Sequence, residues 1–593
     1  MSRQALFLVA AAWLALLTVV VNAQVEVNAP SNKHNLSVSG PGPVKAVTET
    51  EICIFCHTPH NANPAVPLWS HTMSAGVNYL PYTSSTLNAA VGVPTGSSKL
   101  CLSCHDGTVA VGSTMNYGVK AMSGVNGAGQ LTGASVIGTD LRDDHPISFV
   151  PVLAPEIKAP PAGSPVKLDA NGQVQCRTCH EPHRMDIDPT TLKFLVVNNS
   201  ASGLCVTCHD KQYWATDPST HKTSNKNFTA AQGAHTGYTT VATNGCESCH
   251  KPHGATAAQR NLVGSEELTC QPCHGINAIG RNITAEFSKT YRHPTYSTTP
   301  SIHDASESPT NPLHTLPETA AAAARHAECA DCHNPHASYA AVAAAPKGSG
   351  KLAGVWGIDS NGALRLPGGT PSSVNEYEIC YKCHADSANQ PQPGGGPAPP
   401  YQNRQARQFN KRLQFDPANP SFHPIEAAGK GLTSPSLIPP WTTTSIMLCT
   451  DCHDNDTGPK APTPGAGPLG PHGSNIKHIL IARYDMDNER YPESAAAYAL
   501  CYKCHNRTSI LNDQSFREHN RHLGAQSPCS ICHDSHGISS TQGTATNNAH
   551  LVNFDLRFVT PSSGGLLRYD SLGPRTGRCY LTCHGKNHNP LSY

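Results

Sequence analysis

The sequence is poor in the residues that build an ordinary globular core. Of its 593 residues, 38% are hydrophobic, 6% are aromatic and 14% are charged. Because so few residues are charged, mutual repulsion does not account for an open chain. The sequence has 48 glycines and 49 prolines, which predicts a loop-rich fold that is held together by something other than a large apolar core.

Long hydrophobic runs are missing except at the start of the chain. Arg3 precedes an apolar run over residues 5–21, and residues 21–23 (Val-Asn-Ala) resemble a cleavage site. This pattern predicts a signal peptide over residues 1–23. A membrane anchor is the alternative, but the run is at the short end for crossing a bilayer. No other stretch is apolar enough to span a membrane, and no cysteine lies near the cut. We therefore expect an exported protein, at the cell surface or outside the cell rather than in the periplasm.

An excess of charge of one sign is also absent. Without residues 1–23 the chain loses only Arg3, so 41 basic side chains balance 41 acidic ones. A basic stripe is the footprint of a nucleic-acid-binding protein, and we expect no such partner here.

No cysteine in the sequence stands outside a pair. The 24 cysteines form twelve pairs, each followed at once by His, which we number as motifs 1 to 12 in chain order. The eleven C-x-x-C-H motifs are Cys53/Cys56/His57, Cys101/Cys104/His105, Cys176/Cys179/His180, Cys205/Cys208/His209, Cys246/Cys249/His250, Cys270/Cys273/His274, Cys329/Cys332/His333, Cys380/Cys383/His384, Cys449/Cys452/His453, Cys501/Cys504/His505 and Cys529/Cys532/His533. Motif 12, Cys579/Cys583/His584, has one extra residue between its cysteines.

C-x-x-C-H is the signature of covalent c-type haem attachment. The two thiols add to the two haem vinyl groups, and the adjacent His becomes the proximal ligand of the iron. Disulfides do not explain a His after every second cysteine, and zinc or iron–sulfur sites need about four ligands each. The sequence therefore predicts twelve covalent haem c groups, with the extra residue of motif 12 bulging outward.

Methionine is too scarce to supply the second axial ligands. Only six methionines remain beyond Met1, whereas 21 histidines lie outside the motifs. We therefore expect two His ligands on each iron, which lowers the reduction potential relative to His/Met ligation and leaves no open iron position.

Two sets of six histidines are the candidates for this second ligand. The first set lies just beyond a motif and is well placed to bind a neighbouring haem: His60, His183, His253, His336, His536 and, as the nearest substitute after motif 9, His472. The second set precedes the odd-numbered motifs: His34, His145, His235, His326, His423 and His522. Credible substitutes are His293, His303, His519 and His550, and weaker ones are His71, His221, His314, His478 and His588.

The alternation of motifs with and without a close second His predicts six dihaem modules. We place their bounds at 24–158, 159–225, 226–290, 291–400, 401–510 and 511–593. The mature chain offers about 48 residues per haem, too few for a packed pocket of domain size around each one. The expected fold is a multihaem cytochrome c: mainly coil with short helices wrapped round a haem chain and little β structure. Residues 155–165, 391–400 and 461–471 are predicted spacers, and residues 317–324 and 494–500 are predicted short helices.

Local strings resemble the doubled-CxxCH multihaem cytochromes of metal-reducing bacteria. They are KHNLS before CIFCHTPHN, LCLSCHDGT, DDHPIS and RCYLTCHGKNH, and the resemblance covers essentially the whole mature chain. It implies close-packed bis-His haems that carry electrons across the periplasm or to outside acceptors, in some members within extracellular filaments. The missing close His after motif 9 and the longer spacing of motif 12 depart from this pattern.

We expect an electron carrier and not an enzyme. Its partners would be other c-type cytochromes, extracellular acceptors such as metal oxides, or further copies of the chain in a filament. One alternative is a multihaem redox enzyme of the nitrite or hydroxylamine type, which needs an open iron position. Two others are a periplasmic electron-storage cytochrome and a subunit of an outer-membrane conduit.

Overall fold

The computed structural model describes residues 27–62, 68–232, 237–295, 316–321, 326–369, 372–390, 403–430, 434–486 and 493–593. The predicted signal peptide, the predicted spacer 391–400 and the candidate ligands His235, His303 and His314 lie outside these residues. The chain divides into two compact units, one of residues 1–215 and 221–272 and the other of residues 216–220 and 273–593. The six predicted dihaem modules remain a prediction.

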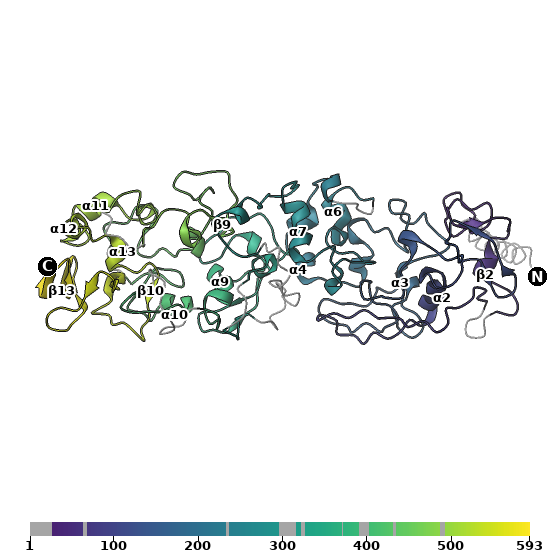
Figure 1. The fold of residues 1–593 in the computed structure, drawn as a ribbon, viewed down its shortest axis with the longest axis horizontal. Coiled ribbons are helices and arrows are strands. Elements are labelled where there is room, and N and C mark those ends of the chain that lie inside the picture. The colour runs from purple at the N-terminus through teal and green to yellow at the C-terminus, as the bar shows by residue number, and fades with distance from the viewer. Residues whose placement is uncertain are drawn as a thin grey trace, which may run out of the picture. The chain divides into compact units, whose positions relative to one another are not determined.

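Most of the described chain is irregular, with short helices between long loops (Figure 1). The α-helices are α2 (Gly96–His105), α3 (Cys176–Cys179), α4 (Gln212–Thr216), α5 (Thr220–Thr223), α6 (Val241–Asn244), α7 (Glu266–His274), α8 (Cys329–Cys332), α9 (Glu376–His384), α10 (Lys411–Phe415), α11 (Arg507–Leu511), α12 (His519–Gly524) and α13 (Cys529–Cys532). The 3₁₀ helices are η1 (Cys53–Phe55), η2 (Gly133–Ser135), η3 (Ser200–Ser202), η4 (Cys205–Thr207), η5 (Ala230–Gln232), η6 (Gly245–Ser248), η7 (Gln259–Asn261), η8 (Glu286–Ser288), η10 (Gly350–Leu352), η12 (Cys449–Asp451), η13 (Lys477–Ile479), η14 (Cys501–Lys503) and η15 (Ala549–Leu551).

Strands are two residues long in most of the molecule. Antiparallel pairs join β1 (Lys45–Ala46) to β4 (Met122–Ser123), β2 (Ser113–Thr114) to β3 (Gly118–Val119), β5 (Tyr291–Arg292) to β9 (Gly473–Ser474), β6 (Gly357–Ile358) to β7 (Leu364–Arg365) and β8 (Ser421–Phe422) to β10 (Gly537–Ile538). The exception is a four-stranded antiparallel sheet at the C-terminus, in which β13 (Thr576–Cys583) pairs with β11 (Val559–Thr560), β12 (Arg568–Gly573) and β14 (Lys586–Ser592).

The predicted fold class is confirmed: the protein is a coil-rich chain with short helices. The sequence did not predict the C-terminal sheet. Residues 495–500, predicted as a helix, form consecutive turns that lead into η14. Of the other predicted helix, residues 317–321 are described and are not helical. Within the described residues no helix is both long and apolar enough to cross a membrane.

Apolar packing is divided into small clusters. One lies around Trp356, Tyr377 and Tyr381, and another packs Phe554, Tyr569 and Leu581 against the C-terminal sheet. A cluster in the first unit contains Tyr79, Leu102 and Leu141. Thiol-bearing side chains lie against two of these clusters: Cys383 and Cys449 on the first, and Cys532, Cys579 and Cys583 on the second. Small apolar clusters beside cysteines fit a chain in which bound groups complete the core.

Candidate haem-binding sites

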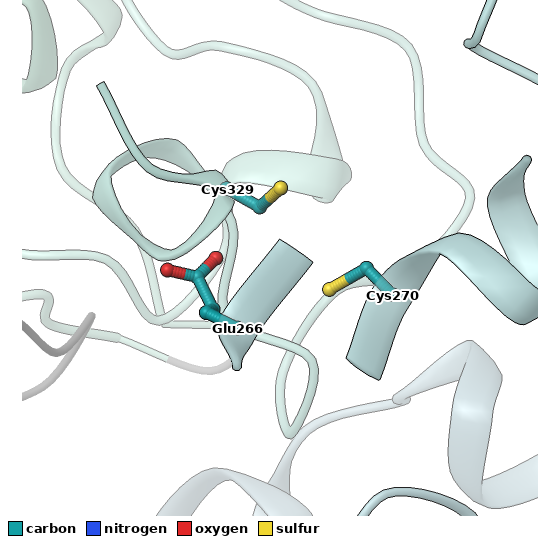
Figure 2. A group of neighbouring side chains, drawn as sticks. All are labelled: Glu266, Cys270 and Cys329. Carbon is teal, nitrogen blue, oxygen red and sulfur yellow. The ribbon is translucent and has the colours of Figure 1, made fainter. Parts of the chain in front are cut away.

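All eleven C-x-x-C-H motifs are folded as helical turns. Motifs 2, 6 and 8 end the longer helices α2, α7 and α9, and the other eight are single turns. In each of those eight the backbone N–H of the motif His donates to the carbonyl of the first cysteine at 2.8–2.9 Å. Cysteines three apart on a helical turn lie on one side of it. None of the 24 cysteines forms a disulfide, so each turn presents two cysteine side chains and an imidazole together. Figure 2 shows Cys270 on α7 and Cys329 at the start of α8.

Hydrogen bonds orient the motif imidazoles. Seven of them hold Nδ1 at 2.7–3.1 Å from a backbone carbonyl oxygen, namely His105, His180, His250, His274, His333, His453 and His533. A donating Nδ1–H leaves the lone pair on Nε2, the nitrogen that can bind a metal. The carbonyls for His453 and His533 come from His478 and His550, two residues that the sequence offered as substitute ligands. These two histidines therefore position motif imidazoles through their backbone.

Eight pairs of imidazoles face each other at nearly one distance. Metal–imidazole bonds are about 2.0–2.1 Å, so two imidazoles on opposite sides of one iron have ring centres about 6.3 Å apart. The pairs, with centres 6.0–6.3 Å apart, are His34–His105, His57–His183, His145–His209, His180–His253, His293–His384, His333–His472, His453–His536 and His519–His533. Each pair joins a motif His to one outside the motifs, and each spacing fits one iron atom.

The pairs reveal a regular order that the sequence did not give. A second His that follows an odd-numbered motif faces the motif His two motifs earlier: His183 faces His57 and His253 faces His180. His472 and His536 repeat this relation in the second unit. His34, His145 and His293 each precede an odd-numbered motif and face the His of the next even-numbered motif, whereas His519 faces the His of motif 11 itself. The feature of the sequence that could have indicated this order is the second His that recurs just beyond an odd-numbered motif.

The other named histidines lie as follows. His293, offered by the sequence only as a substitute, faces His384, while His326 lies 3.8 Å from Glu318. His519, also a substitute, faces His533 from α12, the helix that carries His522. Burial, and after it the charge of His423, lowers the pKa of His505 to about 4. The imidazoles of His423 and His505 are therefore neighbours. His336 donates its backbone N–H to Asn334.

His60 and His71 differ from the paired histidines. His60 is exposed, and no ring pair is seen for its imidazole among the described residues. His71 is buried with Nδ1 and Nε2 at 2.8 and 3.2 Å from the carbonyls of Thr72 and Ala110. A neutral imidazole donates one N–H, so His71 bonds to one of these carbonyls, and its Nε2 also lies 3.4 Å from Sγ of Cys104.

Burial favours the neutral form of several of the facing imidazoles, which is the form that binds a metal. Desolvation is the largest cause that lowers the pKa of His34, His180 and His209 to about 4 and that of His472 to about 3. Backbone carbonyls oppose this effect at His34 and His180. The lowered pKa values of these four imidazoles therefore favour the unprotonated nitrogen that a metal ligand needs.

A small pocket in the first unit lies beside one of these spaces. Its lining includes Cys176 of motif 3 and His253, which faces the imidazole of that motif. Leu102 and Ile147 supply apolar walls. Thiol, imidazole and apolar surface thus meet at one pocket, and these are the groups that hold a covalently attached haem. When bound, haem would supply a redox-active iron here.

Cysteines of successive motifs also lie close together. The Cys101 thiol hydrogen-bonds to Cys176, which raises the pKa of Cys101 and lowers that of Cys176 to about 7. Cys205 and Cys246 repeat this contact. In the second unit, a hydrogen bond to Cys449 is the largest cause that raises the pKa of Cys380.

Further thiols are neighbours across successive motifs. In each of these contacts burial is the largest cause that raises the pKa of one thiol, and the charge of a thiol in the neighbouring motif raises it further. The contacts are Cys56 with Cys104, Cys179 with Cys208, Cys452 with Cys504, Cys501 with Cys529, and Cys532 with both cysteines of motif 12. Motifs 1 to 5 in the first unit and motifs 8 to 12 in the second therefore each form an unbroken series.

Cys249 and Cys273, the second cysteines of motifs 5 and 6, are placed through their backbone. Cys249 follows η6 and donates its N–H to the carbonyl of Cys246 at 3.1 Å. Cys273 lies in the last turn of α7, and its carbonyl accepts the N–H of Gly280 at 3.0 Å. Both side chains are half-buried. The boundary between the two compact units falls just before Cys273, inside motif 6, whereas the sequence placed motifs 5 and 6 in one module. The thioethers of these two cysteines, like those of the other 22, stay predictions.

Comparison with known proteins agrees with these sites. The family model described as the doubled CXXCH motif matches residues 169–213 and 239–278, which contain motifs 3 to 6. No curated protein matches the chain. The matched motif is the one found in multihaem c-type cytochromes. The same cysteine and histidine spacing is repeated along the rest of the chain, so the chain carries throughout the kind of motif that occurs in multihaem c-type cytochromes.

Proposed function

We propose that the protein carries electrons along a row of twelve covalently bound haems, each with two His ligands, to acceptors outside the cell such as metal oxides. The observation that carries this proposal is the set of eight imidazole pairs with ring centres 6.0–6.3 Å apart. An iron held between two imidazoles has no position for substrate, so it exchanges electrons without binding a reactant.

The cysteine contacts support a row in chain order. The first cysteines of motifs 2 and 3, 4 and 5, and 8 and 9 touch, and these cysteines attach to the edges of their haems. Haem edges of neighbouring motifs would therefore lie side by side. Such an arrangement suits rapid transfer from one iron to the next.

The direct test is electron delivery by the purified holoprotein. A one-electron donor should reduce the whole haem absorbance, and particulate ferric oxide should then reoxidise it. As a control, carbon monoxide should leave the reduced spectrum unchanged. Stoichiometric carbon monoxide binding would reveal an open iron position and would favour a redox enzyme instead.

A second part of the proposal is that copies of the chain join end to end. His183, His253, His472 and His536 each face the motif His two motifs earlier, but His60 follows motif 1 and has no earlier motif in its own chain. Its backbone carbonyl is held at 2.8 Å by both Thr58 and Asn116, whereas its imidazole is exposed. The backbone of His60 is thus held in place, and its exposed imidazole is available to an iron of another copy.

This part is tested by replacing His60 with Ala. We expect loss of long assemblies in electron micrographs, with the haem content and the spectrum of the single chain unchanged. His183→Ala is the matched control, because it removes a ligand inside the chain and should alter the spectrum of one haem. Assemblies of normal length in the His60→Ala variant would contradict the proposal.

A further inference from the structure

Motif 12 is folded differently from the other eleven. Its cysteines lie on strand β13 of the C-terminal sheet (Figure 1), whereas every C-x-x-C-H motif is a helical turn. His584 follows the strand with a φ of +52°, and Gly585 follows it with a φ of +73°. Cys583 pairs with Lys586 across this two-residue turn. Positive φ at both central residues is the signature of a tight type I′ hairpin, so Cys583 and His584 stand at the tip of a β-hairpin.

The strand separates the two cysteines too widely for one macrocycle. Residues three apart on a helical turn have Cβ atoms about 5–6 Å apart, and eleven motifs use that span. A strand rises about 3.3 Å per residue, so Cys579 and Cys583 are about 13 Å apart along β13. Both lie on one face of the strand, against the cluster around Tyr569 and Leu581.

The extended span is held by pairing on both sides of β13. Cys579 is opposite Tyr569 on β12 and Leu591 on β14, and Cys583 is opposite Val559 on β11 and Lys586 on β14. Bringing the two sulfurs to helical spacing would require breaking these ladders. The sheet and a second thioether therefore exclude each other.

The geometry points to attachment of the twelfth haem through Cys583 alone, with His584 beside it as the candidate iron ligand and Cys579 left as a thiol. In this step the S–H of Cys583 adds across one vinyl C=C: the S–C bond forms at one vinyl carbon and the hydrogen goes to the other. No electrons are gained or lost, and the second vinyl group stays intact. This inference rests on the proposed load of twelve haems.

The hydrogen bonds of His584 agree with a site unlike the others. Its Nε2 lies 2.5 Å from the Ser527 hydroxyl, whereas seven other motif histidines use Nδ1 for a backbone carbonyl. Ser527 therefore occupies the nitrogen that binds iron elsewhere, and it must turn away when His584 does so. Cys579 is packed between Tyr569 and Leu591, away from the hairpin tip.

The test counts haems and thiols on the same sample of wild-type holoprotein. Intact mass gives the number of haems, and alkylation after denaturation gives the number of thiols. We expect twelve haems and one alkylated thiol, mapped to Cys579 by peptide sequencing. Twelve haems with no alkylated thiol would overturn this inference and leave the proposed function standing. Eleven haems with alkylation at both Cys579 and Cys583 would overturn both the inference and the proposed haem count.

Two variants sharpen the result. Cys579→Ala should keep twelve haems and the wild-type pyridine haemochrome spectrum, since Cys579 makes no thioether. The matched control is Cys529→Ala, which removes the first cysteine of the neighbouring regular motif 11 and should shift about one twelfth of the haemochrome band to longer wavelength. A shift of the same size in Cys579→Ala would contradict single attachment.

Discussion

Replacing Asp144 by Asn should raise the reduction potential of one haem, the one that motif 3 binds. Asp144 is buried, and its Oδ1 lies 3.1 Å from Nδ1 of His253, the imidazole that faces His180. A carboxylate at this position stabilises the more positive ferric state. Removing its charge therefore makes reduction easier, and the potential rises.

The size of this effect follows from the geometry. With His253 between them, the carboxylate and the iron position are about 7 Å apart, and Coulomb's law with an effective dielectric constant of about 20 gives about 2.4 kcal/mol. At about 59 mV for each tenfold change in a one-electron equilibrium, this corresponds to about 100 mV. The assay is a spectroscopic redox titration of holoprotein, in which about one twelfth of the absorbance change should move upward by that amount.

Asp140→Asn is the matched control for this experiment. Asp140 lies in the same segment but is exposed and pairs with Arg142 at 2.6 Å, so solvent and salt screen its charge. We expect no resolved shift in this variant. Equal shifts in the two variants, or a downward shift in Asp144→Asn, would refute the assignment of His253 as the ligand opposite His180.

Three further predictions concern haem load, ligation and charge. Intact mass of the exported protein should equal the chain from Gln24 plus twelve haems, because 24 cysteines form twelve motifs; any other count would correct the haem load. His34→Met should raise the potential of one haem without loss of haem, since His34 faces His105 while cysteines hold the cofactor; an unchanged titration would remove His34 from the ligands. Holoprotein should focus well below the sequence pI of about 7.6, because each haem adds two propionates, and a neutral pI would show that the propionates are neutralised.

The sequence predicted the coil-rich fold and proposed the attachment sites because both depend on local spacing. A Cys three residues from another, with His next to it, defines a helical turn that needs no distant contact. The second ligands depend on contacts far along the chain, as between His34 and His105 or His293 and His384. The sequence could name such histidines but ranked His326 above His293, the one that faces His384.

The C-terminal sheet could not be predicted for a related reason. Strands β12, β13 and β14 alternate only weakly between apolar and polar residues, and β14 contains Pro590. Their pairing comes from the hairpin turn at His584 and Gly585 and from packing of Tyr569 and Leu581. A motif that ends in Cys-His-Gly was interpreted as a haem site with a bulge, and the same residues also make a tight β-turn.

The central claim is that every iron is held between two imidazoles. Electron paramagnetic resonance of the fully oxidised holoprotein tests it most directly, because an iron with two His ligands is low-spin. The account predicts low-spin ferric signals that integrate to the full haem content. A high-spin ferric signal equal to one or more haems per chain would contradict it.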